Sequence, residues 1–385
     1  MQSILHDLPV PLAERPSFGG RLLEFLLVGG ATLALFPLSW WLQHQVGLDA
    51  AELAAGFLTF HAAYVINDPH FSVTYLLFYR DVKARAFGAA YGRRQRLRYC
   101  FAGFVAPLGL AAWALAALWR GSAPGLGWLI QLMFLLVGWH YVKQGFGVLT
   151  VLSRRRGEAL SPRERRICEF HCYAAWAYAW ANPAVPAGQY EEKGVVYWAV
   201  PRALELEQLA GLVLIVSSFA LAAMLVAKWR RDRRILPMAP LLGFLITIWA
   251  WTIYSSADPL IRYAIPALHS IQYLYFVWLM QRNQARAEEG PPAFGRPAAL
   301  RLGVLALSAL ALGWLGFRGI PTLLDELFVP EARGVPALGE LGATPFLAAF
   351  FVVINIHHYL MDYVIWRRDN PDTRYLVSNR FHAEM

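Results

Sequence analysis

Histidine is the chemically most informative residue of this sequence, because most of its copies lie inside long apolar segments. Ionisable side chains are costly inside a membrane and tend to mark functional sites there. Neutral imidazole is also a good ligand for iron, copper and zinc. Seven of the ten histidines lie in apolar segments, and we predict that they form a buried metal site: His61, His70, His140, His171, His269, His357 and His358.

Polar residues accompany these histidines at helical spacing. Gln144 follows His140 by four residues and Asp362 follows His358 by four, so each pair shares one face of a helix. A metal-bound histidine usually donates its second ring N–H to such a partner. The predicted catalytic carboxylates, acting as bridging ligands or bases, are Asp68, Glu169 and Asp362, and the predicted outer partners are Asn67, Gln144, Gln272 and Asn355.

The number of histidines favours a dinuclear iron centre, because one metal ion needs only about three or four protein ligands. Copper, for which Cys168 and Cys172 offer sulfur, and zinc come after iron. Two histidines on separate helices could instead hold haem axially. His171 and His357 are the two most easily explained as packing residues, since His357 points about 100° away from His358 on a helix.

The composition shows what kind of element must position these residues. Of the 385 residues, 57% are hydrophobic and 16% charged, whereas soluble domains are about 45–50% apolar and about 25% charged. A soluble interior cannot hide so much apolar surface, and three cysteines cannot support a disulfide framework. We therefore predict an all-α, polytopic membrane bundle, with residues 1–385 forming a single transmembrane domain that ends in a short tail, 367–385.

About 20 apolar residues cross a bilayer as a helix, and ten segments qualify. The second is too long for one straight helix and contains Asn67-Asp68-Pro69, which predicts an interruption. Residues 1–20 lack an apolar core, so the first span is expected to act as its own insertion signal. The predicted spans are 22–43, 52–79, 99–119, 125–152, 166–181, 207–228, 236–254, 260–281, 299–317 and 345–366.

Basic residues alternate between rich and poor loops along the chain. The rich loops are 80–98, 154–166, 228–234, 282–301 and 367–380, and the loops between them hold few basic residues. The positive-inside rule then places both termini in the cytoplasm, and we expect a bacterial-type inner (plasma) membrane. The net charge of +9 is explained in this way and does not indicate nucleic-acid binding.

Two family resemblances are limited to short patterns. Histidines on the cytoplasmic side of a helical bundle resemble the membrane-bound non-haem iron desaturases and hydroxylases, although the tight His-x3-His and His-x2-His-His boxes of those families are absent. The run from His357 to Asp362 resembles the His-His-x3-Asp motif of acyl-transferring condensation enzymes, with Tyr363 where those enzymes have glycine. Neither resemblance covers the whole chain.

The sequence thus predicts a membrane-bound iron oxidoreductase of the oxygenase, hydroxylase or desaturase type, acting in lipid metabolism on a lipid-like or apolar substrate from the bilayer. Without a nucleotide-binding fingerprint, its electrons would come from a separate donor protein. One alternative is a metal-free acyl or glycosyl transferase that uses His358 as base and Asp362 to orient it. Another is a proton-coupled transporter with its substrate at the Asn67-Asp68-Pro69 break.

Overall fold

The structure is a computed structural model that describes residues 18–89, 91–183, 186–234, 236–329 and 340–377. Residues 1–17, most of the N-terminal segment that lacks an apolar core, lie outside the described residues, whereas the first predicted span, 22–43, lies within them. The α-helices are α1 (Phe18–Phe25), α2 (Ala31–Val46), α3 (Leu48–Ala63), α4 (Asn67–Tyr79), α5 (Val82–Ala86), α6 (Arg93–Cys100), α7 (Ala106–Trp119), α8 (Ala123–Arg155), α9 (Pro162–Ala181), α10 (Leu204–Asp232), α11 (Met238–Ile248), α12 (Pro259–Glu289), α13 (Ala298–Trp314), α14 (Ile320–Phe328), α15 (Pro345–Ile365) and α16 (Arg374–Val377). Short π-helical turns η1 (Leu26–Gly30), η2 (Phe101–Val105), η3 (Trp249–Ile253) and η4 (Leu315–Gly319), the 3₁₀ turn η5 (Pro371–Thr373) and strands β1 (Gly188–Glu192) and β2 (Val195–Ala199) complete the described elements.

The described helices confirm an apolar helical bundle of the kind that crosses membranes. Six helical stretches are long and apolar enough to span a bilayer: Gly19–Val46, Arg93–Trp119, Ala123–Arg155, Leu204–Asp232, Ala298–Phe328 and Pro345–Ile365. The other four predicted spans are also helical, but they are shorter, as in α3, α4 and α11, or less apolar, as in α9 and α12. These two less apolar helices carry predicted ligands, His171 on α9 and His269 on α12.

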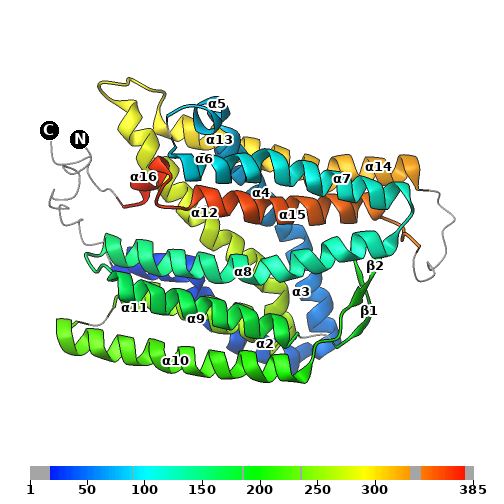
Figure 1. Cartoon of the computed structure of the whole chain (residues 1–385), viewed down its shortest axis with the longest axis horizontal. Coiled ribbons are helices and arrows are strands. Elements are labelled where there is room, and N and C mark those ends of the chain that lie inside the picture. Colours follow the sequence, from blue (N-terminus) through cyan, green and yellow to red (C-terminus); the bar gives the residue numbers. More distant parts are fainter. Residues whose placement is uncertain (1–17, 90, 184–185, 235, 330–339, 378–385) are drawn as a thin grey trace.

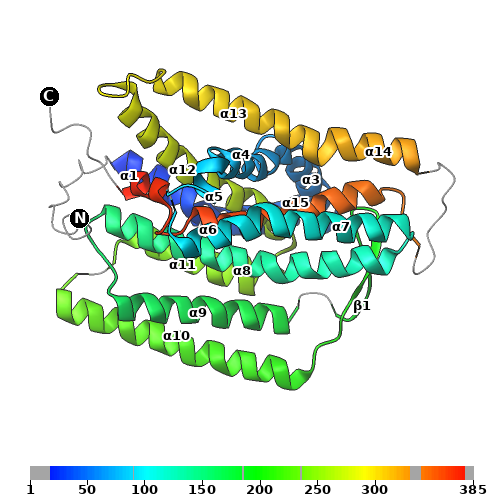
Figure 2. The same ribbon diagram turned by 45° about the horizontal axis from the view of Figure 1, so that its top comes forward.

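Most long helices run side by side along the length of the molecule, and α12 crosses them obliquely (Figure 1). Helix α10 packs on α9, α9 on α8, and α8 on α15, while α13 covers α4. The hairpin of β1 and β2 lies at one end, and α16 lies at the other (Figure 1). Helix α1 also lies at that other end (Figure 2). Helices α4, α8, α12 and α15 meet in the interior, so polar residues on their inner faces can converge.

The predicted interruption of the second span is confirmed. Helix α3 ends at Ala63 and α4 begins at Asn67, with Ile66 outside the helical region at φ −120° and ψ −62°. Pro69 lies in the first turn of α4, where its missing N–H has no helical partner to lose. The break therefore allows a new helix to start inside the bundle, and its first turn carries His70.

A second irregularity ties the first span to the core. Gly29, in the π-helical turn η1, has φ +122°, a conformation that favours glycine. The carbonyl of Val28 next to it accepts a hydrogen bond of 2.7 Å from Nε2 of Gln272 on α12. Oε1 of Gln272 in turn accepts one of 2.7 Å from Nε2 of Gln144 on α8. These two amides connect η1, α12 and α8 through buried hydrogen bonds.

The C-terminal segment folds back onto the bundle as far as residue 377. Asn283 donates a 2.7 Å hydrogen bond to the carbonyl of Tyr375, and Arg155 donates one of 2.8 Å to the carbonyl of Leu376. Arg85 pairs with Asp372 at 2.6 Å. The part of the predicted tail between 367 and 377 is thus packed against α8 and α12, and residues 378–385 lie outside the described residues.

The first test of this scaffold is Gln272→Leu. The variant leaves the buried Val28 carbonyl without the Gln272 amide and removes one of the two acceptors of the Gln144 amide; an unsatisfied buried group costs about 1–3 kcal/mol. We expect a clearly lower unfolding temperature in detergent. Gln131→Leu is the matched control, because Gln131 donates to the carbonyl of Trp198 at the exposed periphery, where water can replace it. Equal stability of both variants would contradict a structural role for the amide network.

Candidate metal centre

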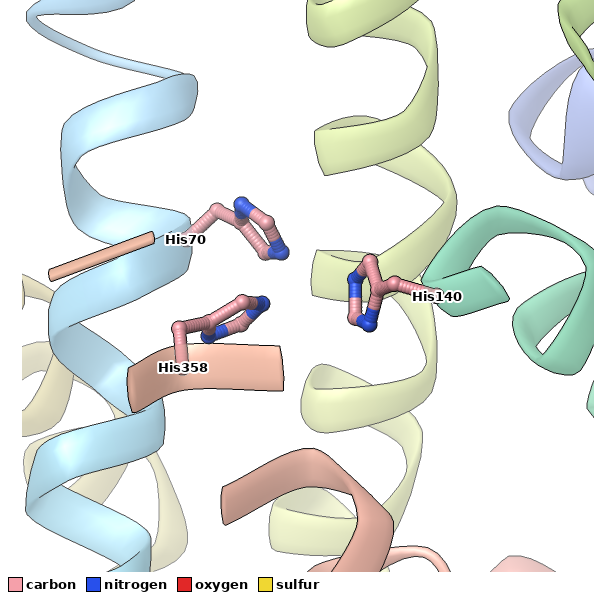
Figure 3. Close-up of side chains that lie close together, drawn as sticks. All are labelled: His70, His140 and His358. Carbon is pink, nitrogen blue, oxygen red and sulfur yellow. The ribbon is translucent and has the colours of Figure 1, made fainter. Parts of the chain in front are cut away.

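Four histidine rings from four helices meet in the interior of the bundle. His70 comes from α4, His140 from α8, His269 from α12 and His358 from α15, and all four are buried. Ring centroids lie 4.5 Å apart for His70 and His358, 5.0 Å for His140 and His358, 4.8 Å for His140 and His269, and 5.2 Å for His70 and His269. Three of these rings point toward one another in Figure 3.

The donor atoms of these residues lie at distances that suit one small cation. His70, His140 and His358 each offer one ring nitrogen, and the three nitrogens lie within 4.8 Å of one another. Nε2 of His269 lies 3.0 Å from Nε2 of His140. Oδ2 of Asp362, one helical turn beyond His358, lies 3.3 Å from Nε2 of His358 and 3.7 Å from Nε2 of His140. The cluster therefore offers four imidazoles and one carboxylate.

Hydrogen bonds on the far side of two of these groups hold them in place. The hydroxyl of Ser270 lies 3.1 Å from Nδ1 of His70, which leaves Nε2 of that ring for the centre. The hydroxyl of Tyr273 donates a 2.7 Å hydrogen bond to Oδ1 of Asp362 and lies 2.6 Å from the hydroxyl of Thr74. Such outer partners are what orient metal ligands in proteins.

Several buried polar atoms of these five residues have no hydrogen-bond partner within the part of the chain that the structure describes. They are Nε2 of His70, Nδ1 of His269, both ring nitrogens of His358 and Oδ2 of Asp362. Buried polar groups in proteins are nearly always hydrogen-bonded, and each unsatisfied one costs about 1–3 kcal/mol. A cation held by the inward-facing lone pairs would remove much of this cost. The residues present therefore fit a metal ion.

The other three predicted histidine ligands lie elsewhere. His61 is exposed on α3, where its ring packs against Phe57. His171 lies on α9, with Nδ1 3.0 Å from the hydroxyl of Ser217. Nε2 of His357 donates to the carbonyl of Ala102 at 2.9 Å. The structure thus brings together four of the seven histidines, and His171 and His357 have ordinary packing partners.

Of the three predicted carboxylates, one lies at the cluster and two lie elsewhere. Only Asp362 joins the cluster, because Asp68 faces Arg318, with Oδ2 3.7 Å from Nε. Glu169 faces Lys143 at 3.7 Å. The sequence indicates how deep Arg318 and Lys143 lie in the bilayer, but it does not show which carboxylate each of them faces.

The predicted outer partners lie at different distances from the cluster. Gln144 donates a 3.0 Å hydrogen bond to the carbonyl of His269, as well as its bond to Gln272. Asn355 accepts a 3.0 Å hydrogen bond from Tyr359, whose ring lies against His140 with centroids 4.7 Å apart. Asn67 is the first residue of α4, three residues before His70, and its buried Oδ1 has no hydrogen-bond partner among the described residues.

Ser270 and Thr74 were not predicted from the sequence as partners of the centre. Thr74 follows His70 by four residues and Tyr273 follows His269 by four, so both spacings signalled a shared helix face. Ser270 adjoins His269 but faces His70, a contact between helices that spacing along one chain segment does not reveal.

A pocket of about 280 Å³ leads from the centre to one end of the bundle. His140, Tyr273, Tyr359 and Asp362 line its inner part. A second hollow of about 320 Å³ lies beside it with an almost entirely apolar lining, and Trp139 and Tyr363 border both. The rings of these two residues lie 5.6 Å apart and form the shared wall.

Comparisons with protein-family models, with curated proteins and with solved structures found no match. We therefore infer the function from the donor atoms, the burial and the pockets of this chain.

Metal content of single histidine variants tests the assignment of ligands. Protein produced with iron available is expected to retain metal in His171→Ala and His61→Ala, because these rings lie outside the cluster. His140→Ala and His358→Ala should lose most of it, since each removes a donor from a small set. Elemental analysis by mass spectrometry on equal amounts of folded protein gives the ratio. Full metal content in His140→Ala and His358→Ala would overturn the site.

Proposed function

We propose that this protein is an integral-membrane metalloenzyme whose centre binds one iron ion through His70, His140, His269, His358 and Asp362. The observation that carries the proposal is the convergence of buried ring nitrogens of His70, His140 and His358. Beside them, Nε2 of His70, Nε2 of His358 and Oδ2 of Asp362 have no hydrogen-bond partner among the described residues. A hydrogen-bonded packing cluster would leave fewer of these atoms unsatisfied.

The donor set favours iron over the other metals. Zinc sites are usually four-coordinate, whereas five donors are at hand here. Magnesium and calcium prefer oxygen ligands. Copper(I) is favoured by sulfur, but Cys168 and Cys172 pack in a separate apolar cluster with Val142 and Phe244.

The geometry also favours one iron ion over two, and it leaves no space for haem. A second iron ion would need further ligands, and His61, His171 and His357 lie away from the centre, so we propose one ion rather than the two suggested by the number of histidines. Haem would have to lie between two axial imidazoles. Centroid distances of 4.5–5.2 Å between the rings leave no space for a macrocycle among them.

The proposed reaction is oxidation of an apolar, lipid-like substrate by dioxygen. Iron would supply the activation of oxygen. Hydroxylation of a C–H bond consumes one O₂, two electrons and two protons, and it yields one alcohol and one water. We propose that the two electrons come from a separate donor protein. The apolar hollow beside Trp139 and Tyr363 supports an approach of substrate from the side of the bundle.

Residues of this chain provide the surroundings that such a reaction needs. The hydroxyl of Tyr273 donates a hydrogen bond to Oδ1 of Asp362, and the hydroxyl of Thr74 is hydrogen-bonded to that of Tyr273. Aromatic side chains, including Tyr359 and Trp139, line the pocket next to His140 and limit the access of water. Helices α4, α8, α12 and α15 supply these groups.

One observation favours a second candidate, the metal-free transferase. Nε2 of His358 lies 3.3 Å from Oδ2 of Asp362, a distance at which a carboxylate can orient a catalytic base. This alternative requires full activity without metal. It also leaves His70 and His140 without a role.

We further propose ten crossings of a bacterial-type inner membrane, with both termini in the cytoplasm. In support, the C-terminal ends of α8, α10 and α12 lie at the same end of the bundle as α16, so the loops rich in arginine gather there (Figure 1). The hairpin of β1 and β2, in a loop poor in basic residues, lies at the opposite end.

Labelling of single cysteines tests this topology. In a background where Cys100, Cys168 and Cys172 are serine, a membrane-impermeant maleimide on intact cells should label Gln189→Cys in β1. It should label Gly157→Cys, in an arginine-rich loop, only after permeabilisation. The reverse pattern would invert the proposed orientation, and labelling of both sites on intact cells would contradict the single crossing between them, the span 166–181.

Oxygen incorporation tests the reaction. Cells expressing the protein under ¹⁸O₂ should accumulate ¹⁸O-labelled hydroxylated lipid, measured by mass spectrometry of the lipid extract. His140→Ala should reduce the label to the level of cells without the protein, because the centre loses a ligand. His171→Ala is the control that should retain it. ¹⁸O label in lipid that does not depend on His140, or activity of metal-free protein, would contradict the oxygenase proposal.

A further inference from the structure

The pocket that reaches the centre carries an excess of positive charge at its other end. Four cationic side chains line that end, together with two acidic ones, Glu169 and Asp369. The cationic residues come from three parts of the chain and are Lys143, Arg165, Arg367 and Arg368. Excess charge in a narrow opening with low-dielectric walls attracts a ligand of opposite sign.

Two arginines at this opening make few interactions with other described residues. Arg165 has its guanidinium 5.8 Å from the ring centroid of Phe146, and its side chain makes no hydrogen bond or ion pair to any described residue. Nε of Arg367 is buried without a hydrogen-bond partner among the described residues. Its nearest carboxylate, on Asp369, lies 4.0 Å away. Guanidinium donors therefore remain for a ligand, and a guanidinium is well suited to a carboxylate or phosphate.

The space between this opening and the centre is walled by aromatic rings. Trp139, Phe276, Tyr359 and Trp366 line it. On α8, the lining extends from His140 to Val151, which at 1.5 Å per residue corresponds to about 16 Å. A ligand that fills the pocket thus has a charged head at one end and an apolar body that reaches the centre.

The size of the pocket limits the body of this ligand. Sites for drug-sized molecules usually enclose about 300–1,000 Å³, and this pocket encloses about 280 Å³. A lipid with two acyl chains does not fit that volume. A single slender chain does.

We propose that the pocket binds a single-chain amphiphilic anion, with its carboxylate or phosphate head on Arg165 and Arg367 and its chain directed to the centre. The assignment of this anion as the substrate rests on the proposed function, whereas its binding does not. Lys143, paired with Glu169 at 3.7 Å, and the exposed Arg368 add to the positive potential at the opening.

The test compares three probes on protein in phosphatidylcholine nanodiscs: dodecanoate, dodecyl phosphate and uncharged methyl dodecanoate. Binding is measured with radiolabelled probe, and empty nanodiscs give the background. We expect saturable binding of at least one anion and none of the ester, and the tighter of the two anions identifies the head group. Arg165→Gln and Arg367→Gln should each weaken binding about tenfold or more, because each loses a charge-assisted hydrogen bond.

Two further variants make the test specific. Arg163→Gln, on an exposed position of the same helix as Arg165, removes the same charge outside the pocket and should bind like the unaltered protein. Arg165→Lys keeps the charge and should restore part of the affinity. Equal binding of the ester and the anions, or equal affinities of Arg163→Gln, Arg165→Gln and Arg367→Gln, would overturn the proposal.

Metal content measured on the same samples separates this proposal from the proposed function. Selective anion binding by protein that takes up no metal would support the pocket and contradict the metal centre. Iron-loaded protein without selective anion binding would support the metal centre and contradict the binding of an anion in the pocket.

Discussion

The structure depends on one constraint: polar side chains buried in an apolar bundle must find partners. Water is absent from the interior of a membrane domain, and an unsatisfied polar group there costs several kcal/mol. Buried polar residues such as Gln272 and Asn355 meet the constraint with protein partners. His70, His269, His358 and Asp362 do so only in part among the described residues. The missing partner is what points to a bound cation.

Local irregularities of the backbone place these residues where they can meet. The break between α3 and α4 starts a helix within the bundle and positions His70 in its first turn. The π-helical turn η1 exposes the Val28 carbonyl, and Gln272 uses it to fix α12 next to His269. Helix α15 supplies both His358 and Asp362 from one face.

Much of the fold followed from the sequence, because hydrophobic length and the positions of proline are strong signals. The helical class, the apolar spans with six long enough to cross and the break before Asn67-Asp68-Pro69 all appear in the described structure. The hairpin β1–β2 was not expected, since its two five-residue strands pair only with each other in a segment read as a loop. Its positive φ angles at Lys193 and Gly194 mark the tight turn that makes it possible.

The site was harder to predict in detail. The order of the spans indicates the depth of a residue in the bilayer, but it does not fix the rotation of each helix about its axis. His171 and His357 therefore have suitable depth but face Ser217 and the Ala102 carbonyl. His61 lies on α3, before the break, and faces outward. Asp362 lies at the centre beside His358 because a spacing of four residues places both on one face of the helix, whatever the rotation of that helix about its axis.

We propose that one iron ion lies among these imidazoles. X-ray absorption at the iron edge of the purified protein is the decisive measurement, because imidazole ligands give a characteristic multiple-scattering pattern. We expect a shell of nitrogen and oxygen neighbours with several imidazoles and no second iron nearby. An iron spectrum without imidazole scattering, or one with a short iron–iron distance, would contradict it.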